Sequence, residues 1–203
     1  IDLTVEIASD GTITNSLTLS RTHHGIRGLL FTGVNNVDYL RVYVPKGSVL
    51  LAADGFRAPD PALFEIPDED WIMDDDLAYG LAAASVHPAS GTTILEEHGK
   101  TVFGNWVQTR PGTTSTVTLR YELPFKLDLL RDGRTLIARA KSLIGIPQTQ
   151  LYTIHVQKQS GVLDRATQVR VSYPNTLTPL WSSHDPAFAR LTNETDAVIA
   201  ILF

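Results

Sequence analysis

The densest group of side chains that could do chemistry is a run of six carboxylates within nine residues. They are Asp68, Glu69, Asp70, Asp74, Asp75 and Asp76. Calcium takes about six to eight oxygen ligands, often from a flexible loop, so this run predicts a calcium site. The acids lack the alternating spacing and central Gly of an EF-hand loop, and a solvated acidic loop is the alternative interpretation.

Three other residues are candidates for contact with a ligand: Trp71, His23 and His24. An exposed aromatic ring among carboxylates can stack on a carbohydrate or contact a peptide, although packing of Trp71 onto the body of the protein would also explain it. Adjacent histidines point apart in an extended chain, which is poor geometry for a shared metal ion. The other four histidines are isolated in sequence and predict no metal site.

The sequence assigns no catalytic residue. A Gly-x-Ser-x-Gly elbow for a serine hydrolase is absent, and the chain has no cysteine, so it has neither a thiolate nucleophile nor a Cys-based zinc site. Glu96, Glu97 and Glu122 fall on neighbouring expected strands and leave open a hydrolase that uses paired carboxylates. Their alternative role is to cover the polar outer faces of a sheet.

Charge and hydropathy limit the partners. The chain has 17 Lys and Arg against 22 Asp and Glu, a formal net charge of -5, and its basic residues are scattered singly. We therefore expect no nucleic-acid partner. No stretch approaches the roughly 18 consecutive apolar residues that a membrane span requires.

The elements that must position these residues are β-strands. Residues 37–51 read as a strand, a tight turn and a returning strand, with Leu40, Val42 and Val44 on one face and Tyr39, Arg41 and Tyr43 on the other. Residues 115–123 show the same alternation. About ten such strands predict an all-β fold, a two-sheet antiparallel sandwich, with a β-barrel as the alternative. With 203 residues and 43% hydrophobic content, we expect a single domain over residues 1–203.

The predicted core follows from the apolar faces of these strands. It contains Val42, Val44, Val117, Leu119, Tyr121, Val169 and Val171.

Turn chemistry predicts the connections. Asp10-Gly11 and Asp132-Gly133 are hairpin signals, residues 77–85 are a candidate helix, and Asp185-Pro186 can begin a second short helix that ends at Leu191. Residues 21–36, with their apolar patch at 29–31, predict irregular structure or a poor edge strand. Residues 54–91 hold four prolines and the acidic run, and predict an irregular excursion from the sandwich.

Four segments resemble a known family. They are YLRVYVPKGSVLL (residues 39–51), EEHGKTVFGNWVQTRPG (residues 96–112), LRYELP (residues 119–124) and YTIHVQKQSG (residues 152–161). In this order they resemble the C-terminal β-rich region of bacterial membrane-anchored proteins that carry the domain of unknown function 4012. The resemblance covers roughly the middle two-thirds of the chain.

That resemblance implies an extracytoplasmic location in the bacterial cell envelope and supplies no catalytic residues. The chain begins with Ile1 inside a strand pattern, so we expect a piece of a longer protein that contacts the membrane only through a preceding part. The expected function is a non-catalytic structural or binding module for an envelope glycan or protein. A hydrolase that acts on an envelope polymer is the alternative. Any contact surface should lie on residues 21–36 and 54–91, because loops on a rigid scaffold vary without loss of the core.

Overall fold

The computed structural model describes residues 1–127, 149–157, 166–191 and 197–203. Strands make up 52% of the structure and helices 5%, which confirms the predicted all-β, sandwich-like class. The described residues form thirteen strands in three sheets, where two sheets were expected. Each of these sheets has two edge strands, so the sheets of the described residues do not close into a barrel. The predicted hairpin at Asp132-Gly133 lies outside the described residues.

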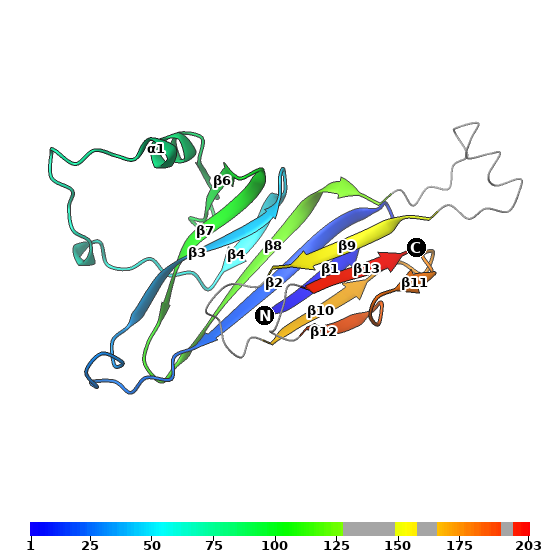
Figure 1. Cartoon of the computed structure of the whole chain (residues 1–203), viewed down its shortest axis with the longest axis horizontal. Coiled ribbons are helices and arrows are strands. Elements are labelled where there is room, and N and C mark those ends of the chain that lie inside the picture. The colour runs from blue at the N-terminus through cyan, green and yellow to red at the C-terminus, as the bar shows by residue number, and fades with distance from the viewer. Residues whose placement is uncertain (128–148, 158–165, 192–196) are drawn as a thin grey trace, which may run out of the picture. The chain divides into compact units, whose positions relative to one another are not determined.

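The chain divides into two compact units, whose helices and strands are labelled in Figure 1. Unit 1 contains residues 1–17 and 125–203, and unit 2 contains residues 18–124. Strands β2 (Thr12–Thr22) and β8 (Thr114–Lys126) each contribute residues to both units. Unit 2 is therefore continuous in sequence, whereas unit 1 is built from the two ends of the chain.

Unit 1 contains two groups of paired strands. In the first, the order is β12 (Phe188–Leu191), β10 (Thr167–Ser172), β1 (Asp2–Ile7) and β2. In the second, the order is β11 (Trp181–Ser182), β13 (Ala197–Leu202) and β9 (Leu151–Val156). Strands β1 and β10 run parallel, with Leu3 opposite Val169, so the expectation of a purely antiparallel sandwich is wrong at this pair.

The core of unit 1 is formed by the alternate residues of these strands. Val5, Val169 and Ile201 are fully or almost fully buried, as period-two strands with one covered face require. Tyr173, which follows β10, and Phe203, which follows β13, bring their rings to 5.2 Å, centroid to centroid. The aromatic pair therefore joins the two groups of strands.

The hairpin predicted at Asp10-Gly11 is confirmed between β1 and β2. Gly11 has a φ of 83°, and the oxygen of Leu127 occupies the space that a Cβ would need. The Asp10 carboxylate accepts hydrogen bonds from Lys126 Nζ at 2.6 Å and from Thr12 Oγ1 at 2.8 Å. These bonds, that from Lys126 above all, hold the pKa of Asp10 well below its usual range.

Unit 2 is also built from two groups of strands. One contains β8 and β4 (Val49–Asp54), paired antiparallel. The other has the order β3 (Asn36–Pro45), β7 (Lys100–Thr109), β6 (Thr93–Glu97) and β5 (Ser85–Val86). Between β4 and β5 the chain forms a short 3-10 helix, η1 (Pro61–Leu63), and one α-helix, α1 (Asp75–Ala82), which lies beside β6.

The core of unit 2 lies between these two groups. Leu119 of β8 is 1% exposed, and Phe103 of β7 packs its ring 5.7 Å from the ring of Tyr121 on β8. Six of the seven predicted core residues are buried, and two of those, Val169 and Val171, belong to unit 1. The seventh, Val42, is only half-buried. Because β3 is an edge strand, it has a neighbouring strand on one side only.

Two predicted helices have different outcomes. The helix expected at residues 77–85 exists as α1, which begins two residues earlier and ends three residues earlier than expected. The helix expected from Asp185 to Leu191 is wrong, because that segment forms a turn at Asp185 and then β12. Ala189 and Leu191 alternate into the core and pair with β10, and this strand pairing overrides the helix-start signal of Asp185-Pro186. Among the described residues, no helix is long and apolar enough to cross a membrane.

Candidate functional site

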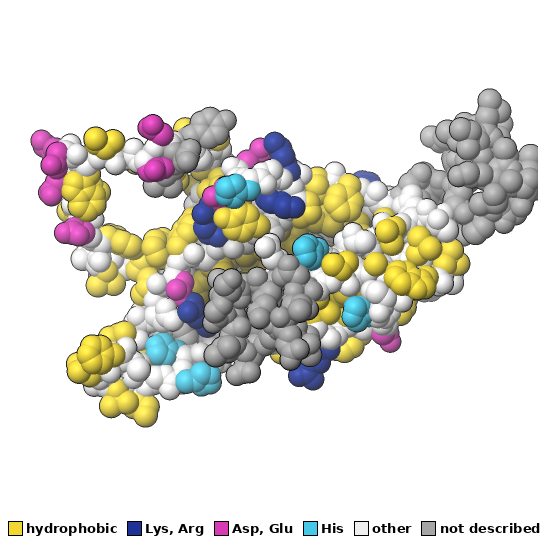
Figure 2. All heavy atoms as spheres, in the orientation of Figure 1, with side chains coloured by type: hydrophobic (Ala, Val, Ile, Leu, Met, Phe, Trp, Pro, Cys, Tyr) yellow, Lys and Arg dark blue, Asp and Glu magenta, His cyan; other side chains and the backbone are white. Residues whose placement is uncertain are grey.

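The connection between β2 and β3 carries an unusual number of outward-facing apolar side chains. We call residues 23–35 the apolar loop. Ile26 is 66% exposed, Leu30 is 80% exposed and Phe31 is 86% exposed, and Leu29 and Val34 are more than half exposed. Figure 2 shows hydrophobic side chains gathered at the outer end of this loop. A contiguous exposed apolar surface of this kind marks a binding site or an interface.

The apolar loop is braced from within by His23. The Nδ1 atom of the ring accepts a hydrogen bond from the Gly25 backbone N–H at 3.0 Å, so Nε2 carries the proton and donates to the Val34 carbonyl at 3.1 Å. The Thr32 carbonyl occupies the space that a Cβ on Gly25 would need. The His23 side chain therefore ties the start of the loop to its end.

The loop is also attached to its neighbours in unit 2. His23 N–H donates to the Thr113 carbonyl, and Gly112 N–H donates to the His23 carbonyl, both at 2.9 Å. At the other end, the Asn35 amide donates to Gln108 Oε1 on β7 at 2.8 Å. These bonds hold the loop in a defined shape although its apolar side chains face solvent.

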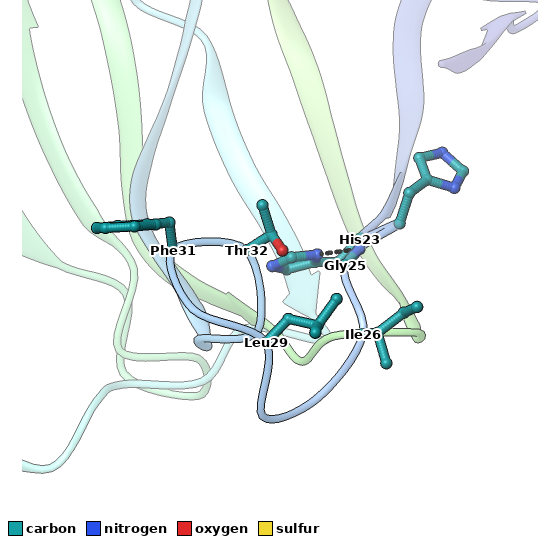
Figure 3. A pocket seen from close by; sticks show the side chains of 7 residues that line it. His23, Gly25, Ile26, Leu29, Phe31 and Thr32 are labelled. Atoms are coloured by element: carbon teal, nitrogen blue, oxygen red, sulfur yellow. Dashed lines mark hydrogen bonds between the residues drawn. The ribbon is translucent and has the colours of Figure 1, made fainter.

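Residues of the folded loop line an open pocket of about 520 Å³. His23, His24, Gly25, Ile26, Leu29, Phe31 and Thr32 line it. Figure 3 shows the His23 ring inside the loop beside Thr32, with its bond to Gly25, while Phe31 points away from that ring. Of the two predicted contact histidines, His23 is thus half-buried and structural, and His24 is exposed.

The exposed charges of the apolar loop and of the turn hydrogen-bonded to it are cationic. Arg27 is exposed within the loop, and Arg110 is exposed in the turn that is hydrogen-bonded to it. Arg21, just before the loop, forms an ion pair with Asp38. The loop itself contains no carboxylate.

The excursion after β4 is fixed to β7 at its beginning. Arg57 N–H donates to the Trp106 carbonyl at 2.8 Å, and Gln108 Nε2 donates to the Ala58 carbonyl at 2.8 Å. Further along, the Phe64 ring lies 5.3 Å from the ring of Trp106. Asp60 then caps η1 by accepting a hydrogen bond from the Ala62 N–H.

The rest of this excursion carries the predicted acidic run on its surface. Asp68, Glu69, Asp70, Asp74 and Asp75 are exposed, and the side chain of Asp76 lies outside the described residues. In the part of the chain that the structure describes, no three His, Asp or Glu side chains are gathered so that they could hold a metal ion. Trp71 is 57% exposed. A ligand contact at Trp71 stays a prediction.

Two of the three glutamates proposed for a carboxylate hydrolase, Glu96 and Glu97, have cationic partners. Glu97 forms an ion pair with Arg41 and accepts a hydrogen bond from the Tyr43 hydroxyl at 2.8 Å. Glu96 forms an ion pair with Lys46 at 2.8 Å. Burial raises the pKa of Tyr43, and its hydrogen bond to the Glu97 carboxylate raises that pKa further.

One polar network was not predicted from the sequence. His87 Nδ1 lies 2.8 Å from Ser90 Oγ, which donates to Thr92 Oγ1 at 2.9 Å. Asn105 of β7 donates to Thr92 Oγ1 at 3.0 Å and to the Ser90 carbonyl at 3.2 Å. These bonds satisfy the polar groups of the turn between β5 and β6. The Pro88–Gly91 turn signal could have located the turn, but the partnership with Asn105 has no signal in sequence.

The chain was compared with protein-family models, curated proteins and solved structures, and none of them matches it. The resemblance to proteins that carry the domain of unknown function 4012 stays a prediction from the four quoted segments.

Proposed function

We propose that this chain is a non-catalytic binding module of a bacterial cell-envelope protein and that the apolar loop is the centre of its contact surface. The observation that carries the proposal is the combination of a braced backbone with apolar side chains that face solvent. A loop that only connected two strands would gain nothing from exposing Leu30 and Phe31. The envelope location rests on the family resemblance alone.

The acidic excursion is the second part of this surface. It is attached to β7 through Gln108, whose amide donates to the Ala58 carbonyl. The same side chain accepts the hydrogen bond from Asn35 at the end of the apolar loop. The bases of the two segments therefore adjoin. Trp71 and His24 supply the exposed aromatic and imidazole groups that contact a glycan or a protein.

A hydrolase acting through carboxylates is less well supported. Among the described residues, Glu96 and Glu97 face cations, whereas a general acid needs an apolar setting that keeps it protonated. Calcium binding by the acidic run would require the excursion to gather carboxylates that are separately exposed here.

The test is cosedimentation of the purified chain with insoluble cell-wall sacculi and binding to arrayed envelope glycans and peptides. We compare the wild type with a Leu30→Asp/Phe31→Asp variant and with a Val198→Asp variant, which replaces an exposed apolar side chain by Asp on a strand of unit 1. The proposal expects binding that is lost only in the loop variant. Binding that survives in the folded loop variant would place the contact surface elsewhere.

A further inference from the structure

Unit 2 exposes two apolar surfaces of opposite charge. The first is the apolar loop. The second is residues 60–75, which we call the acidic segment and which contains seven carboxylates and no Lys or Arg. Figure 2 shows acidic and hydrophobic side chains side by side along the excursion. The exposed apolar residues of the acidic segment are Leu63, Phe64, Ile66, Trp71, Ile72 and Met73.

Neither surface is complementary in charge to the same surface of a second copy. A contact between two acidic segments would place seven carboxylates of one copy against seven carboxylates of the other. Repulsion between these like charges opposes a symmetric contact. Two apolar loops would likewise bring arginines together at their edges. The two surfaces are instead complementary to each other, since both are apolar at the centre and they differ in the sign of their charge.

We propose that the apolar loop of one copy binds the acidic segment of a second copy, an inference that rests on the proposed function and names its partner. The open pocket between Ile26, Leu29 and His23 receives an apolar side chain. Ile72, 95% exposed, and Trp71, 57% exposed, are the projecting candidates. The carboxylates beside them meet the exposed guanidinium groups next to the loop.

Charge makes a lipid surface a poorer partner. Anionic lipids would attract Arg27 and Arg110 but would repel the seven carboxylates of the segment whose base adjoins the loop at Gln108. A second copy of the chain avoids this conflict, because its exposed Arg27 and Arg110 attract those carboxylates.

The proposed contact joins two different surfaces, so a pair of copies still has one unused loop on one copy and one unused segment on the other. Head-to-tail contacts of this kind produce rings if the rotation closes and open chains if it does not. We therefore expect the chain to associate into species larger than a dimer, and we expect the fraction of these species to increase with protein concentration.

Sedimentation velocity of the whole chain over a concentration series tests this. A loop variant, Leu30→Asp/Phe31→Asp, and a segment variant, Trp71→Ser/Ile72→Ser, change only exposed side chains, and Val198→Asp is the control. Each of the first two should weaken association by about 30-fold or more, as loss of a central apolar contact does. Added salt should weaken association of the wild type by screening. Circular dichroism melting confirms that all variants are folded.

Mixing the two variants gives the decisive result. The loop variant still has its acidic segment and the segment variant still has its apolar loop, so an equal mixture should form one intact junction and sediment as a discrete dimer. Neither variant should dimerise alone.

Four results would overturn the inference: a wild type that stays monomeric at all concentrations, a mixture that stays monomeric, a symmetric dimer formed by either variant alone, or a loop variant that self-associates like the wild type but no longer cosediments with vesicles of anionic phospholipid. If the mixture fails while sacculi or arrayed glycans still bind through the loop, the binding module stands and only the second copy is excluded as its partner. If both assays fail, the proposed function fails as well.

Discussion

At the scale of single residues, Leu119 is a buried side chain whose contribution to the stability of unit 2 can be measured. It is 1% exposed on the inner face of β8, between Val117 and Tyr121, which are also buried. Replacement by Ala removes buried methyl groups and leaves a cavity. We expect Leu119→Ala to lower the free energy of unfolding by about 2 to 5 kcal/mol, measured by urea denaturation. Val49→Ala, at a 57% exposed position of β4, is the control, and a loss below about 0.5 kcal/mol at Leu119 would contradict the assigned face.

Tyr43 gives a pH-dependent prediction. Burial and the hydrogen bond to Glu97 raise its pKa in the folded state above the ordinary value of about 10. Its contribution to stability is therefore complete below the unfolded pKa and is lost as the pH rises through the folded pKa. Between about pH 9 and pH 12, the wild type should lose more stability than Tyr43→Phe. The free energy of unfolding is measured at each pH by chemical denaturation. Equal losses of stability in the two proteins would show that Tyr43 does not contribute to the pH dependence.

At the scale of elements, the strands could be predicted from the sequence and their partners could not. The alternation in β8 identified Val117, Leu119 and Tyr121 as one face, and the Asp10-Gly11 turn identified the first hairpin. A period-two pattern carries no information about which strand lies next to it, so the parallel pair β1 and β10 was missed. In the candidate site, the irregular loop was expected, but its outward-facing Phe31 and its His23 brace depend on backbone contacts within the folded loop.

The excursion should be the least protected described element of unit 2. Between Phe64 and α1, its side chains are exposed and its backbone has few hydrogen bonds. Amide hydrogen exchange reports local opening, so residues 65–74 should exchange faster than residues 117–123 of β8. Equal protection in the two segments, measured by NMR or mass spectrometry, would place the excursion in the cooperative core.

Calcium should not stabilise this element. The described carboxylates of the acidic run are separately exposed, and no group of three is gathered among the described side chains. A ligand that binds only the folded state raises the melting temperature, whereas calcium at about 1 mM should leave it unchanged within about 1 °C. Magnesium at the same concentration controls for ionic strength. A rise specific to calcium would restore the calcium site that the sequence suggested.

At the scale of the whole molecule, the seven residues expected to share one core divide between the two units. Val44, Val117, Leu119 and Tyr121 are buried in unit 2, whereas Val169 and Val171 are buried in unit 1. The strand pattern is the same in both units, which is why the sequence offers no sign of the division. Only the pairing of strands distinguishes them.

The position of β1 also has a consequence for the order of folding. β1 lies between β10 and β2, and the amino group of Ile1 donates to the carbonyl of Ala166, 165 positions further along the chain. During synthesis, β1 can pair with β2 at once but must wait for β10, whereas unit 2 is complete by residue 124. Contacts between distant residues form late because closing long loops costs chain entropy. In pulse-labelled refolding, amides of β7 and β8 should become protected before those of β10. The opposite order would mean that the two ends of the chain meet first.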